Sequence, residues 1–165
     1  MKIKLGISVI ASILAGCSTS IAPERQTRAD RPFNATSTER IETTRDGTST
    51  AFTLNGYKQD LAHRISQVNS TKVYVTRPQA LLRSVVVVKY QIDRDGNLIG
   101  SEILRSNRDR ETETIALATL RNTAPFPKPA PHLLRQGSVD ILESWLFNND
   151  GRFQLRTIAQ PQMDQ

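Results

Sequence analysis

Four consecutive valines are the feature that most constrains the fold of this chain. They open an apolar run at residues 85–92, and β-branched side chains in such a run favour a strand over a helix. Residues 93–97 follow with Asp-Gly at their centre, and a second apolar run covers residues 98–104. An Asp-Gly turn between two such runs predicts a β-hairpin.

A second hairpin is predicted near the end of the chain. Residues 139–147 alternate between apolar and polar side chains, residues 148–151 form the turn sequence Asn-Asn-Asp-Gly, and residues 152–158 alternate again. Because neighbouring strand residues point to opposite faces, Phe153 and Leu155 are expected to face inward and Arg152, Gln154 and Arg156 outward. Residues 161–165 are expected to fray.

Two further segments predict helices. The first covers residues 57–68, where apolar side chains recur at helical spacing: Tyr57, Leu61, Ile65 and Val68. The second covers residues 109–121, with acidic side chains in its first turn and Arg121 in its last, as the helix dipole favours. Four prolines within residues 125–131 then require an extended segment. This order predicts an α+β domain at residues 55–160, a four-stranded antiparallel sheet of two hairpins with two helices on one face.

The N-terminus has the pattern of a short export signal. Lys2 and Lys4 precede about ten mostly apolar residues, which is the length of a secretory signal and too short to span a bilayer. The segment ends in Leu14-Ala15-Gly16-Cys17, which resembles the lipobox of bacterial lipoproteins. An ordinary signal peptide that ends near a cysteine by chance is the alternative.

The lipobox resemblance implies a location. Residues 1–16 would be removed, Cys17 would carry a diacylglyceryl group and further acyl chains, and the chain would reside in the periplasm. In lipoproteins of this type an Asp after the cysteine favours the inner membrane, so Ser18 implies the outer membrane. Two or more acyl chains are enough for stable anchoring.

Residues 17–54 are expected to form a flexible tether, because Ser, Thr and Arg dominate and no period is visible. The alternative for residues 51–54 is a short strand docked on the domain. The whole chain has 22 Lys and Arg against 16 Asp and Glu, a formal charge of +6. In an exported chain this charge indicates a solvated or lipid-facing surface rather than a nucleic-acid partner.

The sequence predicts neither an enzyme nor a cofactor. A single cysteine excludes an intramolecular disulfide, and His63 and His132 cannot form a zinc centre without carboxylates. Asp140 and Glu143 fall on opposite faces of one predicted strand, so they cannot act as a carboxylate pair. We therefore expect no catalytic residue and no metal site.

Three motifs together resemble a known family. They are the valine-rich strand with its Asp-Gly turn, the Ala- and Leu-rich helix, and Ala124-Pro125-Phe126-Pro127. They are similar to the C-terminal domain of TonB and to related TolA-like domains, over residues 57–147. The resemblance implies a domain that binds peptides by adding a strand to an open sheet edge. It leaves transport linked to TonB open, although a lipid anchor and a short tether replace the transmembrane helix and long linker of TonB.

The sequence therefore predicts a lipid-anchored binding module for an envelope or outer-membrane protein. Residues 85–92 and 152–158 are the two candidate edges, and we favour the second, where Arg152, Gln154 and Arg156 would contact the partner. The alternative function is a chaperone or pilot lipoprotein that assists assembly of an outer-membrane channel. A homodimer formed by exchange of strands also stays open.

Overall fold

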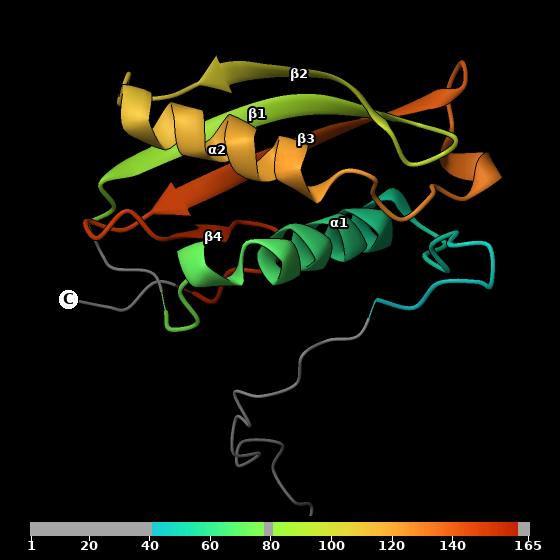
Figure 1. The fold of residues 1–165 in the computed structure, drawn as a ribbon, viewed down its shortest axis with the longest axis horizontal. Coiled ribbons are helices and arrows are strands. Elements are labelled where there is room, and N and C mark those ends of the chain that lie inside the picture. Colours follow the sequence, from blue (N-terminus) through green and yellow to red (C-terminus); the bar gives the residue numbers. More distant parts are fainter. Residues whose placement is uncertain (1–40, 78–80, 162–165) are drawn as a thin grey trace, which may run out of the picture. The chain divides into compact units, whose positions relative to one another are not determined.

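Four antiparallel strands form one sheet in the order β2-β1-β3-β4 (Figure 1). The structure is a computed structural model that describes residues 41–77 and 81–161. The strands are β1 (Ser84–Asp93), β2 (Leu98–Arg105), β3 (Ser138–Phe147) and β4 (Phe153–Leu155). The helices are α1 (Leu54–Val68) and α2 (Arg110–Thr123), with short 3-10 helices η1 (Ser70–Lys72) and η2 (Pro131–Leu133). The predicted α+β class, with two hairpins and two helices packed on the sheet, is confirmed.

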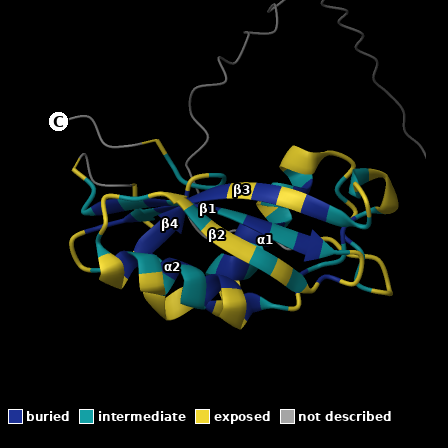
Figure 2. Cartoon of the chain, turned by 90° about the horizontal axis from the view of Figure 1, so that it is seen from above, coloured by how far each residue is buried: buried dark blue, intermediate teal, exposed yellow. Residues whose placement is uncertain are grey.

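The core lies between the helices and one face of the sheet. Every second side chain of β1 is buried, from Ser84 to Ile92. Their partners on β3 are buried too, with Tyr90 opposite Ile141 and Val86 opposite Trp145. Figure 2 shows these buried positions alternating with more exposed ones along the strands. Successive residues of a strand point to opposite faces, so these alternate positions form the face that meets the helices.

The two helices reach the sheet through narrow apolar faces. Tyr57, Leu61 and Ile65 of α1 are fully buried, and the Thr53 hydroxyl caps the helix by accepting the N–H of Gly56. α1 contacts α2 and β4, whereas α2 contacts β1 and β2. The buried face of α2 consists of small or medium side chains: Thr112, Ala116, Thr119, Leu120 and Thr123.

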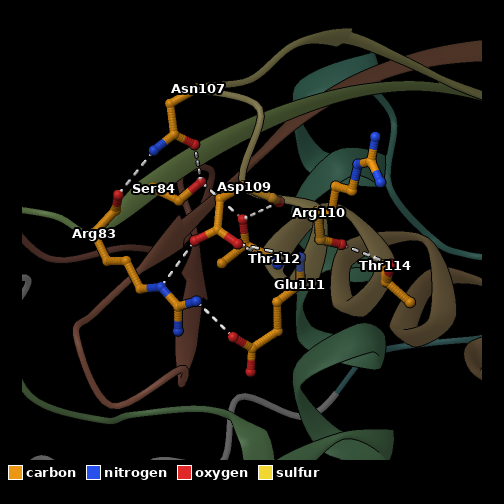
Figure 3. A network of polar contacts seen from close by, with 8 residues as sticks. All are labelled: Arg83, Ser84, Asn107, Asp109, Arg110, Glu111, Thr112 and Thr114. Atoms are coloured by element: carbon orange, nitrogen blue, oxygen red, sulfur yellow. Dashed lines mark hydrogen bonds and ion pairs between the residues drawn. The ribbon is translucent and has the colours of Figure 1, made fainter.

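A polar network fixes the beginning of α2 against the beginning of β1 (Figure 3). The Asp109 carboxylate accepts the N–H groups of Glu111 and Thr112, and Arg83 donates from Nε to Asp109 Oδ2 at 2.9 Å. Arg83 also pairs with the Glu111 carboxylate. The Thr112 hydroxyl donates to Ser84 Oγ at 2.9 Å. The N-cap of α2 is thus also its attachment to the sheet.

The proline segment after α2 is held by Phe126. This side chain is 4% exposed, and its ring stacks on Tyr90 with centroids 6.2 Å apart. Its N–H donates to the carbonyl of Gly96, in the turn between β1 and β2, at 2.8 Å. The segment therefore packs against the turn as well as the core.

The ordered domain begins earlier than the predicted boundary at residue 55. Ser49 is 2% exposed, and its N–H donates to the Lys128 carbonyl at 2.9 Å, while the Lys128 N–H donates to Gly47. The expectation of a tether through residue 54 is thus wrong for residues 41–54. The strand-like pairing occurs at residues 47–49, whereas residues 51–54 contact the domain without forming a strand. The cause is backbone pairing with a segment about 80 residues away, which composition does not reveal.

Candidate functional site

The two edges expected from the sequence are not open. Residues 85–92 belong to β1, which lies between β2 and β3 and is therefore not an edge at all. β4 is an outer strand, but Val73 bridges to Phe153, and the Tyr74 N–H donates to the Phe153 carbonyl at 3.2 Å. The chain after η1 thus covers the outer side of β4.

The predicted contact residues do not form one surface. Gln154 is 8% exposed, and its side-chain amide donates to the carbonyls of Tyr74 (2.8 Å) and Thr76 (2.7 Å). The prediction that it points outward is wrong, because the covering segment buries it. Arg152 is exposed but pairs with Asp150 in the turn, and Arg156 is exposed beyond the end of β4.

The predicted lipidation site lies outside the described residues. Cys17 and the lipobox residues Leu14, Ala15 and Gly16 precede residue 41, and their roles stay predictions. In residues 41–77 and 81–161, no helix is long and apolar enough to cross a membrane. The same residues hold no group of three or more His, Cys, Asp or Glu side chains placed to bind a metal ion.

One half of β3 is open instead. β4 pairs only with Trp145, Leu146 and Phe147. The Ser144 carbonyl accepts the N–H of Arg156, and Ser138 exchanges two backbone hydrogen bonds with Arg135. The peptide groups of Ser138 and Ser144 therefore face away from β1. Residues two apart in a strand turn their peptide groups to the same side.

The peptide groups of Asp140 and Leu142 therefore face this outer side as well. Among the residues that the structure describes, none pairs with them there. Two N–H and two C=O groups are thus available to an added strand.

A groove of about 570 Å³ lies beside these free peptide groups. Its lining comes from the start of α1, from η2 and the turn after it, and from β1 and β3: Leu54, Gln91, His132, Leu133, Leu134, Arg135, Gln136, Ser138, Val139 and Asp140. The His132 Nε2 lies 2.7 Å from the Phe52 carbonyl oxygen, which fixes η2 next to α1. Leu54 is 43% exposed and Leu142 50%. Apolar side chains beside free backbone groups suit an extended peptide.

Glu143 lies where the closed and open parts of β3 meet. It is 4% exposed on the helix-covered face, and its Oε1 accepts the N–H groups of Ser144 (2.8 Å) and Thr157 (3.3 Å). The Ile158 N–H donates to Leu155 and the Ala159 N–H to Arg156, so the chain turns away from the sheet here and does not continue along Leu142. The bond from Thr157 to the Glu143 carboxylate lies within this turn. The sequence signal that could have revealed this role is a charged residue on the apolar face of residues 139–147.

The Glu143 carboxyl is also perturbed electrostatically. Burial raises its pKa above the ordinary value, while hydrogen bonds from Thr157 and Ser144 and the charge of Lys58 act in the opposite direction. Because the pKa of Glu143 is higher in the folded chain than in the unfolded chain, the protonated carboxyl stabilises the fold, and this stabilisation is complete below the unfolded-state pKa. This contribution is lost as the pH rises through the folded value.

Glu143→Gln is therefore expected to change the pH dependence of stability. The ordinary pKa of a glutamate is about 4.3. As the pH rises above this value, the free energy of unfolding of the variant should increase relative to that of the unmodified chain. Gln keeps an oxygen for both N–H donors but does not titrate. Urea unfolding between pH 4 and pH 7 measures the difference, and equal slopes for the two proteins would contradict the assignment.

Glu143→Leu is the matched variant. It removes the titration as Gln does, but it also leaves the N–H groups of Ser144 and Thr157 without their acceptor. We expect it to flatten the pH dependence in the same way and to lower stability at every pH.

No family model, curated protein or solved structure matches this chain. The domain is classified by its fold alone: an α+β domain with a four-stranded antiparallel sheet and two helices. In this sheet β4 pairs with only part of β3. Its resemblance to the C-terminal domain of TonB stays a prediction from the sequence motifs.

Proposed function

We propose that this chain is a protein-binding module of the cell envelope, held at the outer membrane by acyl chains on Cys17. The module takes an extended segment of an envelope protein as an added strand on the open half of β3. The observation that carries this proposal is the pair of free backbone positions, Asp140 and Leu142, beside a groove of about 570 Å³.

The geometry suits strand addition in two ways. Affinity would come from hydrogen bonds between the backbones, which any sequence can form. Selectivity would come from alternate side chains of the added strand. One set would meet Leu54, Leu133 and Val139 on the groove side, and the other would lie over the helix-free face near Leu142.

Leu142→Pro tests the open edge directly. Its N–H faces away from β1, so proline removes a free donor and blocks an added strand without breaking the β1–β3 ladder. We expect affinity for a bound peptide to fall about tenfold or more, because one backbone hydrogen bond is lost and the proline ring occupies its place. The peptide would be selected from a displayed random library against the full chain in detergent, and its affinity measured by calorimetry.

Leu142→Ala is the control, because it removes the same side chain but keeps the N–H. It should weaken the peptide less than proline does, and the circular dichroism of both variants should match that of the unmodified chain. If the proline variant binds as tightly as the alanine variant, the peptide does not add to β3. Failure to select any peptide would equally contradict the proposal.

A further inference from the structure

The opposite edge of the sheet is open along its length. β2 is the outermost strand, and among the described residues only β1 pairs with it. Ser144 turns its carbonyl toward β4, so its partner Val87 and every second residue of β1 turn toward β2. Glu102, the partner of Lys89, therefore faces β1. Its neighbours Ser101 and Ile103 turn their peptide groups outward.

The side chains along β2 suit a protein contact. Ile99 is 54% exposed and Leu104 53%, so both could be buried by a partner. Glu102 and Arg105 are exposed, and neither forms an ion pair with another residue in the described part of the chain. Each end of β2 departs from regular pairing, at Val87/Val88 and at Gln91/Ile92 of β1, whereas residues 101–103 pair regularly.

The charges of Glu102 and Arg105 allow β2 of one copy to pair with β2 of a second copy in one register. The irregularity places Leu104 and Arg105 together opposite Val87, so they occupy one position of the ladder. When two antiparallel copies pair about Ile103, Glu102 of each copy faces Arg105 of the other. Pairing about Glu102 would instead set two like charges against each other, which is unfavourable.

We propose that two copies of this chain associate through β2, in antiparallel pairing about a two-fold axis at Ile103. The result is a continuous sheet in the order β4-β3-β1-β2-β2-β1-β3-β4. Ile103 and Ser101 supply the backbone hydrogen bonds, while Glu102–Arg105 pairs fix the register. The dimer does not depend on peptide binding at β3, and it leaves that groove free at both ends of the sheet.

Charge reversal tests both the dimer and its register. Sedimentation velocity of the full chain in density-matched detergent should show a dimer at micromolar concentration. Glu102→Arg and Arg105→Glu each place like charges face to face, so each should weaken the dimer about tenfold or more. The double variant restores opposite charges and should recover the affinity of the unmodified chain.

Three outcomes would overturn the proposal. The first is a monomer at all accessible concentrations. The second is a dimer that neither single variant weakens, because its contact would then lie elsewhere. The third is a double variant that is folded, as judged by circular dichroism, but stays as weak as the single variants. Arg110→Glu, an exposed charge reversal on α2 at a residue outside the ion pairs of the described chain, serves as the control and should leave the dimer intact.

Discussion

Replacement of Cys17 by serine is expected to remove the chain from the outer-membrane fraction. A hydroxyl cannot take the diacylglyceryl group that the lipobox resemblance assigns to the thiol. Each buried CH₂ of an acyl chain contributes about 0.8 kcal/mol to membrane binding, so two or three chains anchor a protein stably. Mass spectrometry of the native chain should show the acyl mass on Cys17, and the serine variant should lack it.

Ser18→Ala is the matched control, since it changes the next residue and keeps the thiol. It should retain the acyl mass and the outer-membrane location. An unmodified thiol on native material would refute the anchor. The peptide and dimer experiments do not depend on this result, so a failure here would change the location of the module and not its two surfaces.

The second large effect is expected from Gly96→Ala in the turn between β1 and β2. Gly96 has a φ of +86°, and a Cβ built there would lie 2.2 Å from the carbonyl oxygen of Phe126. The left-handed backbone costs a residue other than glycine about 1–2 kcal/mol, and overpacking of a tight site costs about 1–3 kcal/mol more. We expect the free energy of unfolding, measured in urea, to fall by about 2–5 kcal/mol.

Gly47→Ala separates the two contributions. Gly47 has a φ of +83°, but nothing lies within 4 Å of an added Cβ. This variant should lose only the conformational part, about 1–2 kcal/mol. Equal losses for the two variants would mean that the approach of Phe126 to the turn adds nothing, contrary to the packing described above.

Most of the fold could be predicted because its signals are local. The valine run and the Asp-Gly turn specify the first hairpin within about 20 residues of sequence. Tyr57, Leu61 and Ile65 recur at helical spacing and are all buried in α1. Phe126, expected to hold the proline segment, is 4% exposed in the core.

The prediction of the binding edge was wrong where contacts with distant segments of the chain determine burial and strand length. Gln154 follows the alternation of a strand, yet it is buried, because its amide donates to the carbonyls of Tyr74 and Thr76, which lie 80 and 78 residues earlier. β4 was expected over residues 152–158 but covers only Phe153–Leu155, because the chain turns at residues 155–159 and the Thr157 N–H donates to Glu143. No pattern within either strand contains this information.

Local signals in the sequence predict the α+β class and the two hairpins, because side-chain period and turn residues act over a few positions. The sequence also predicts the lipid anchor through a motif of four adjacent residues. The strand edges that are open could be found only from the folded chain. A peptide group is free or paired according to the segment that lies beside it, and at β3 and β4 that segment comes from a remote part of the chain.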